Sequence, residues 1–160
     1  MATHAGRCSC GAVRWETRAE PIRVTTCHCR FCQRATGTAY FVEPIFKSGD
    51  FVVTAGMSTA YHHRSEGSGK RVTIHFCGTC GSKSHLGFER FPDVVGVYAG
   101  GFDDPNWFEI SAGNSKHIFL EAARKDTIIP PGIPTYQQHA ANNDGTSCLA
   151  TIYETFYQVR

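Results

Sequence analysis

Short stretches in which apolar and polar residues alternate recur along most of the chain, and this period of two is typical of half-buried β-strands. β-branched and aromatic residues are frequent in these stretches, and Gly, Pro or Asp separates them. The pattern predicts strands at residues 12–16, 22–25, 39–42, 51–54, 59–64, 71–76, 83–88, 94–99 and 117–120. Residues 30–35 instead favour a helical turn. Strands at this spacing indicate a mainly β fold, either a sandwich or a barrel.

The pattern changes after Ile129. Three prolines at positions 130, 131 and 134 interrupt regular structure, and residues 137–147 are polar with few apolar positions. Residues 149–159 then predict one short strand or helix. We therefore interpret residues 1–135 as one domain and residues 136–160 as a tail that packs on the domain or on a partner subunit.

Length and composition support a single globular domain. The chain has 160 residues, of which 41% are hydrophobic and 19% are charged. No run approaches the roughly 18 apolar residues that span a bilayer, and residues 1–7 lack the apolar stretch of a secretory signal. The 16 basic and 14 acidic side chains give a net charge of +2, which is too small for a nucleic-acid surface. We expect a cytoplasmic protein with no nucleic-acid or membrane partner; its oligomeric state stays open, and a homodimer is one alternative.

Eight cysteines are the feature that points to chemistry. Seven of them are two or three residues apart, whereas disulfide frameworks usually link distant segments of much shorter secreted chains. Tight spacing instead favours convergence on a metal ion. The clustered residues are Cys8 and Cys10, then Cys27, Cys29 and Cys32, then Cys77 and Cys80. Cys148 stands alone, and we expect it to be a buried apolar residue.

Seven thiols cannot fill two four-sulfur zinc sites, so one site closes and the other keeps a position for a substrate. One grouping joins Cys8 and Cys10 to the pair at positions 77 and 80, and leaves the Cys27-x-Cys29-x-x-Cys32 run as the second site. Another joins Cys8 and Cys10 to Cys29 and Cys32. We prefer the first, since the contiguous run can wrap three sulfurs around one ion. A histidine, His28 or one further downstream, could complete that run and make it structural.

The cysteine motifs resemble those of the glutathione-dependent formaldehyde-activating (GFA) family. The matching stretches are residues 8–13 (CSCGAV), 27–37 (CHCRFCQRATG) and 76–82 (FCGTCGS), and residues 99–105 and 116–119 also look like that family. The resemblance covers about residues 5–135. It implies a β-tent fold: layered antiparallel sheets with a zinc knuckle and few short helical turns.

The same resemblance implies two zinc ions per chain. The structural ion maps onto Cys8, Cys10, Cys77 and Cys80, and the second ion maps onto Cys27, Cys29 and Cys32. The implied activity is that of a carbon–sulfur lyase, with glutathione as co-substrate and S-hydroxymethylglutathione as the adduct. The alternative is a non-catalytic, zinc-stabilised module that binds glutathione or another protein.

A thiol is a natural fourth ligand of a three-sulfur zinc site, where coordination deprotonates it at neutral pH. The three cysteines of the second site would therefore be catalytic. The carboxylates of glutathione require cations, for which Arg30, Arg34, Lys83 and Lys116 are the candidates. His85 and His117 are the candidates for general acid or base, since histidine titrates near neutral pH.

Overall fold

The computed structural model describes residues 3–160, which form two compact units. Unit 1 contains the N-terminal residues through Ile22 together with Pro44–Glu109, and unit 2 contains Arg23–Glu43 and Ile110–Arg160. The fold is mainly β, with layered antiparallel sheets and few short helices, so the predicted fold class is confirmed. No helix among residues 3–160 is both long and apolar enough to cross a membrane.

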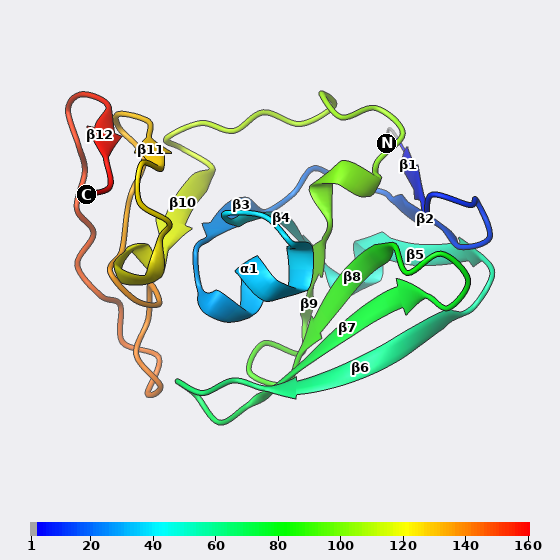
Figure 1. Cartoon of the computed structure of the whole chain (residues 1–160). Helices are drawn as coiled ribbons and strands as arrows, with labels where there is room; N and C mark the ends of the chain where they lie inside the picture. Colours follow the sequence, from blue (N-terminus) through cyan, green and yellow to red (C-terminus); the bar gives the residue numbers. More distant parts are fainter. Residues whose placement is uncertain (1–2) are drawn as a thin grey trace. The chain divides into compact units, whose positions relative to one another are not determined.

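Unit 1 holds two antiparallel sheets. The first has the strand order β1-β2-β5, and in the second β4 pairs with β9, followed by β8, β7 and β6. Figure 1 shows β6, β7 and β8 side by side in green. The strands are β1 (His4–Arg7), β2 (Arg14–Thr17), β4 (Phe41–Lys47), β5 (Phe51–Ala55), β6 (Ser58–Arg64), β7 (Arg71–Cys77), β8 (Lys83–Phe88) and β9 (Val94–Val97), with 3-10 turns at Ser48–Asp50 and Ala99–Gly101.

The core of unit 1 lies between these sheets. Trp15 of β2, Phe46 of β4 and Val97 of β9 are almost wholly buried there and belong to one apolar cluster. Cys8 and Cys77 belong to the same cluster, each with 2% of its surface exposed. Two of the predicted metal ligands are therefore anchored in the core of this unit.

Gly6 packs against the Trp15 indole so closely that no side chain fits. A Cβ at Gly6 would lie 2.5 Å from Trp15 Cε2 and 2.8 Å from the Gly101 carbonyl oxygen. We expect Gly6→Ala to lower the free energy of unfolding by roughly 1–3 kcal/mol, as overpacking of a filled core does. Urea denaturation measures this, with Gly87→Ala as control, because a Cβ at Gly87 meets nothing within 4 Å. Equal losses in the two variants would contradict the assigned packing.

Unit 2 is built around the parallel pair β3 and β10, in which Thr25 lies opposite Lys116 and Cys27 opposite Ile118. Helix α1 follows β3 after two residues, and its C-cap is Gly37, whose φ of 71° suits glycine. The elements of unit 2 are β3 (Arg23–Cys27), α1 (Arg30–Thr36), the first residues of β4, β10 (Ser115–Ile118), a 3-10 turn at Leu120–Ala122, β11 (Ile128–Ile129) and β12 (Tyr157–Gln158).

The C-terminal residues form less regular structure than the sequence suggests. Instead of one strand or helix over residues 149–159, there is a bridge between Thr151 and Thr135 and the two-residue strand β12, which pairs with β11. The tail thus contacts residues 128–135 of its own chain. A domain boundary at residue 135 stays a prediction.

Two further expectations differ from the structure at β4 and β10. The strand expected at 39–42 begins at Phe41 and continues through Pro44 to Lys47, and its pairing with β9 starts at Ile45, after the residue that cannot donate a hydrogen bond. The strand expected at 117–120 lies at Ser115–Ile118 and stops before Phe119, whose φ of 61° turns the chain.

Candidate metal centres

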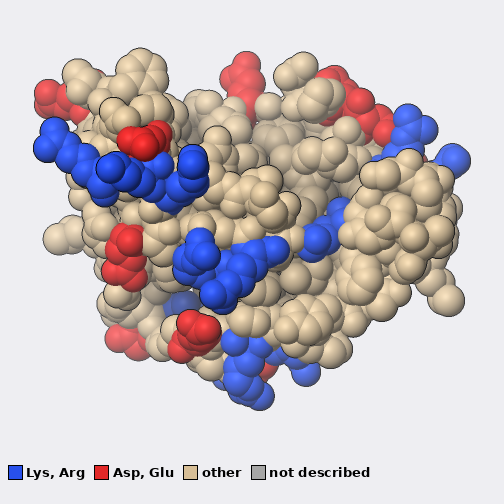
Figure 2. Space-filling model, viewed as in Figure 1, with Lys and Arg blue, Asp and Glu red and all other residues tan. Residues whose placement is uncertain are grey.

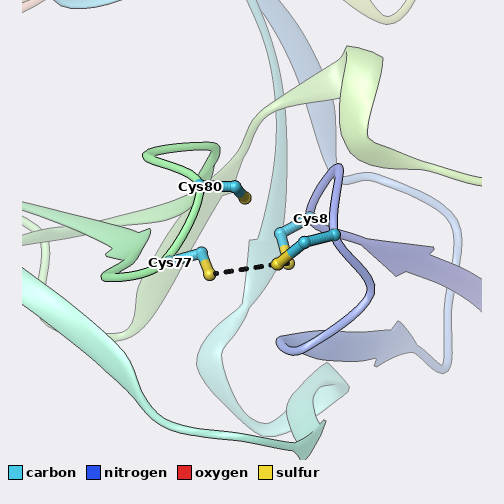
Figure 3. A group of neighbouring side chains, drawn as sticks. Cys8, Cys77 and Cys80 are labelled. Atoms are coloured by element: carbon cyan, nitrogen blue, oxygen red, sulfur yellow. Dashed lines mark hydrogen bonds between the residues drawn. The ribbon is translucent and has the colours of Figure 1, made fainter.

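The first cluster is formed by two turns of unit 1. Cys8 and Cys10 follow β1, while Cys77 ends β7 and Cys80 lies in the turn to β8, so that the labelled sulfurs in Figure 3 approach one another. In the second turn the Gly81 N–H donates to the Cys77 carbonyl oxygen at 2.9 Å, and Gly81 has a φ of 75°. This is the tight, glycine-dependent turn expected of a knuckle.

The sulfur spacing fits a tetrahedral zinc ion. The four ligand atoms lie within 4.8 Å of one another, with Sγ–Sγ distances of 3.5 Å from Cys8 to Cys10 and 3.7 Å from Cys10 to Cys77. Four sulfurs at the usual Zn–S bond length would be about 3.8 Å apart. The cluster could therefore hold zinc with little rearrangement.

The second cluster sits where β3 ends and α1 begins. Cys27 is the last residue of β3, Cys29 caps the helix by accepting a hydrogen bond from the Cys32 N–H at 3.3 Å, and Cys32 lies in the first helical turn. The three sulfurs lie within 4.8 Å of one another. Among residues 3–160, no fourth His, Cys, Asp or Glu ligand atom meets the same distance criterion. The chain thus supplies three ligands here and four at the first cluster.

The thiols of the second cluster share their protons unevenly. Hydrogen bonds from the Cys27 and Cys32 side chains lower the pKa of Cys29 to about 3. Hydrogen bonds with Cys27 and then Cys29, followed by burial, raise the pKa of Cys32, and the hydrogen bond with Cys29 raises the pKa of Cys27. Cys29 is therefore the sulfur most ready to act as a thiolate ligand.

His28 and His117 pair with each other and do not join the sulfurs. Their rings are linked by a 2.9 Å contact between His28 Nε2 and His117 Nδ1, and both side chains are buried. Burial first, and then the charge of His117, lowers the pKa of His28 to about 4; burial also lowers that of His117 to about 4. Strand alternation points His117 to the face opposite Cys27. Its assignment as acid or base stays a prediction.

The four predicted cations occupy different environments. Arg30 on α1 is exposed and donates to the Gln33 side chain, and Arg34 is exposed in the last turn of the same helix. Lys116 on β10 is half-buried, and burial, followed by the charge of Arg23, lowers its pKa. Lys83 begins β8 in unit 1. Their roles toward glutathione stay predictions.

Glu43 is a candidate that the sequence analysis missed. It lies on β4 with 7% of its surface exposed, and its Oε1 atom is buried without a hydrogen-bond partner. Burial raises the pKa of Glu43 to about 8, Arg23 opposes this shift, and Cys29 adds to it. The signal in the sequence was a single acidic residue inside the apolar run from Phe41 to Phe46.

His85 lies on the sheet of unit 1, in a ring stack. Its ring centroid is 4.1 Å from that of His75 with nearly parallel planes, and 4.6 Å from that of Phe51. Burial, and then the charge of His75, lowers the pKa of His85 to about 3. Its role as general acid or base stays a prediction.

Acid is expected to destabilise the protein through His85. In the unfolded chain this histidine binds a proton near its ordinary pKa of about 6.5, whereas in the folded protein it does so only near pH 3. The stabilisation is therefore complete above pH 6.5 and is lost as the pH falls, at up to about 1.4 kcal/mol per pH unit. Urea denaturation from pH 7 to 5 should show a shallower loss for His85→Phe than for wild type. Identical slopes would contradict the assignment.

Cys148 is not the buried residue that was expected. Its side chain is half-exposed, and its Sγ donates to Asn142 Oδ1 at 3.5 Å within a polar turn. The residues on either side, Ser147 and Leu149, are exposed, so this segment does not lie in a buried core.

Basic and acidic side chains are interspersed on the face drawn in Figure 2, where Asp or Glu lies beside several groups of Lys and Arg. Two exposed ion pairs join Arg7 to Asp103 and Lys70 to Glu89. This distribution agrees with the net charge of +2.

Comparison with known proteins adds three findings. The model of the family described as glutathione-dependent formaldehyde-activating enzyme matches residues 3–122. A Halomonas elongata protein, provisionally named a glutathione-dependent formaldehyde-activating enzyme, is 24% identical over 133 residues, which cover 71% of this chain and 85% of the relative. A crystal structure of a Rhodobacter sphaeroides protein is similar with a TM-score of 0.51 and 25% identity, over 66% of this chain and 96% of that one.

Proposed function

Because this chain belongs to the glutathione-dependent formaldehyde-activating enzyme family, we propose that it is a carbon–sulfur lyase that forms or cleaves the adduct of glutathione with formaldehyde or a related small carbonyl. In the forward direction the glutathione sulfur bonds to the carbonyl carbon. The carbonyl π pair moves to the oxygen, which takes up a proton. The thiol gives up one proton and the oxygen takes up one, so the addition is balanced. The product from formaldehyde is S-hydroxymethylglutathione.

The observation that carries this proposal is the three-cysteine cluster of unit 2, where the chain supplies three sulfurs within 4.8 Å. Zinc prefers four ligands, and catalytic zinc sites keep one of them for a substrate. When bound by Cys27, Cys29 and Cys32, zinc supplies a positive centre that keeps a thiol deprotonated at neutral pH. A second zinc ion at Cys8, Cys10, Cys77 and Cys80 would serve stability.

The surrounding residues hold the three sulfurs in place. The Gln33 amide donates to the His28 carbonyl oxygen at 2.6 Å and to the Ala122 carbonyl oxygen at 2.8 Å, which ties α1 to both neighbouring segments. His117 lies on the sheet face opposite Cys27 and contacts the ring of His28. His28 stands between the ligands Cys27 and Cys29 in the sequence. These contacts fix the strand end and the helix start relative to each other, as a preorganised site requires.

Residues for substrate binding and for proton delivery are proposed from the charge and the protons that each side chain carries. Arg30, Arg34 and Lys116 belong to unit 2 and are proposed to receive the carboxylates of glutathione. Solvent, or His117 of unit 2, would supply the proton to the carbonyl oxygen. A cytoplasmic location, where thiols stay reduced, completes the proposal.

Exchange spectroscopy with labelled formaldehyde and glutathione tests the activity directly. We expect zinc-loaded protein to accelerate formation and breakdown of the adduct above the uncatalysed rate, and heat-denatured protein to have no effect. If glutathione binds but no rate changes with formaldehyde or with longer aldehydes, the chain is the non-catalytic glutathione-binding module instead.

A further inference from the structure

Strand β6 is an open edge of the larger sheet in unit 1. It pairs with β7 over its whole length, Ser58–Arg64, and with no other strand among residues 3–160. Figure 1 shows it as the outermost of the strands β6, β7 and β8. Two other edge strands have a neighbour, since Thr135 forms a bridge to β10 and Phe102 forms a bridge to β1. Within residues 3–160, β6 is therefore the longest edge strand that lacks one.

Every second residue of β6 turns its backbone N–H and C=O groups away from β7. The Ser65 N–H donates to the Lys70 carbonyl oxygen at 2.9 Å, and this pair continues the register of β6 and β7. Bonded and non-bonded pairs alternate along an antiparallel ladder, so the residues with odd numbers bond to β7. The residues that face outward are Ser58, Ala60, His62 and Arg64. Their donors and acceptors form a row that fits a further extended strand.

The side chains of β6 do little to prevent such pairing. Edge strands of natural proteins are usually blocked by Lys, Pro, inward-pointing charges or a bulge. From Met57 to His63 the sequence contains no Lys, Arg, Asp, Glu or Pro, and the register with β7 has no shift. Met57 and Tyr61 are 90% and 56% exposed. The edge is thus regular, almost free of charge and partly apolar.

We propose that β6 pairs antiparallel with β6 of a second copy of this chain, around a two-fold axis at Tyr61. In this register Ser58 lies opposite Arg64 of the partner subunit, and Ala60 lies opposite His62 of the partner subunit. No other antiparallel register joins all four outward-facing residues to one another, so this one satisfies the whole row. A closed, self-complementary interface of this kind is the commonest form of homodimer.

Charge also favours a second copy at this edge. Ser58 lies opposite Cys77 in the β6–β7 register, so the partner's Arg64 would be two strands, or about 10 Å, from a ligand of the four-cysteine cluster. Opposite residues of neighbouring strands share a face. Four thiolates outweigh the charge of one zinc ion, so the loaded cluster is anionic and attracts this guanidinium. The arginines of the two copies lie at opposite ends and do not repel each other.

Tyr61 would contact its own copy across the axis. Facing residues of a non-bonded pair have Cα atoms about 4.5 Å apart, and aromatic pairs at such positions stabilise a sheet. On its other side Tyr61 faces Ile74, which is 5% exposed, so the apolar face of the sheet would continue into the second copy. Seven residues a side are fewer than the roughly 20–30 of a standard interface. We therefore expect a weak dimer that depends on concentration.

Sedimentation velocity of the zinc-loaded full chain over a concentration series tests this dimer. Wild type and Tyr61→Phe should dimerise alike. Tyr61→Lys should dimerise at least about tenfold more weakly, because it sets two cations opposite each other. A mixture of Tyr61→Lys and Tyr61→Glu should dimerise more tightly than either variant alone, since residue 61 faces itself. Leu149→Lys is the control and should behave as wild type, because Leu149 is 98% exposed and belongs to unit 2.

Amide hydrogen exchange distinguishes edge pairing from other contacts. The N–H groups of Ala60 and His62 should exchange more slowly as wild-type concentration rises, whereas that of Tyr61, which bonds to β7, should be slow throughout. A wild type that stays monomeric across the series overturns the inference and leaves the edge to a strand of another protein. A dimer that Leu149→Lys dissociates and Tyr61→Lys does not overturns it as well. The inference is independent of the proposed reaction, because neither measurement involves glutathione.

Discussion

Cys77→Ala is expected to leave the protein unfolded or insoluble at 25 °C. Cys77 ends β7, is 98% buried and belongs both to the core of unit 1 and to the four-cysteine cluster. Structural zinc contributes about 10–16 kcal/mol to folding in small zinc domains, whereas whole domains are stable by only about 5–15 kcal/mol. Losing one of four ligands should therefore remove most of the stability. Circular dichroism and urea denaturation of the zinc-loaded protein measure it.

The matched control is Cys148→Ala, which removes a thiol of the same size outside both clusters. Cys148 is half-exposed in a polar turn, so its variant should unfold within about 0.5 kcal/mol of wild type. If Cys77→Ala unfolds at the same urea concentration as Cys148→Ala, the four-cysteine cluster has no structural role.

Cys32→Ala is expected to fold but to lose glutathione binding and turnover. It removes one of the three sulfurs at the β3–α1 junction while leaving the four-cysteine cluster intact. The buried thiol itself contributes about 1–2 kcal/mol by packing, which a domain held by another zinc ion can tolerate. Glutathione affinity should fall at least about 100-fold, as measured by calorimetry, because a two-sulfur site holds zinc poorly.

Cys29→Ser serves as the companion variant. A serine oxygen can still accept the hydrogen bond that caps α1, so the local helix is preserved while a sulfur ligand is lost. Both variants should show wild-type circular dichroism. Retained glutathione binding in either variant, or unfolding of both to the extent seen for Cys77→Ala, would overturn the division of roles between the clusters.

The Cys27–Cys32 grouping and each of the two cysteine pairs were accessible from the sequence because their information is local, whereas the joining of Cys8 and Cys10 to Cys77 and Cys80 rested on a preference between two groupings and on the family resemblance. Cys77 and Cys80 lie in one turn, and the Cys27–Cys32 run crosses one strand end and one helix start, so spacing alone indicates convergence. The strands from β5 to β8 were equally accessible, since each alternates in polarity and ends at a turn residue. Neither inference requires knowing which distant segments meet.

The elements that were missed depend on distant contacts or on unusual residues. Strand β1 contains Ala5 and Gly6, which have little strand propensity, and Gly6 is required there because the Trp15 ring fills the space of its Cβ. The pairing of β10 with β3 joins residues about ninety positions apart. Glu43 stands out only through its burial, so spacing could not indicate it.

Zinc analysis tests the central claim most directly: that the chain holds one structural and one substrate-binding zinc ion. Protein reconstituted with excess zinc and then desalted should contain two ions per chain, and a chelator should remove one of them readily. Cys32→Ala should contain one ion, which resists the chelator. A wild-type content of one ion after reconstitution, with no difference between wild type and Cys32→Ala, would contradict the account.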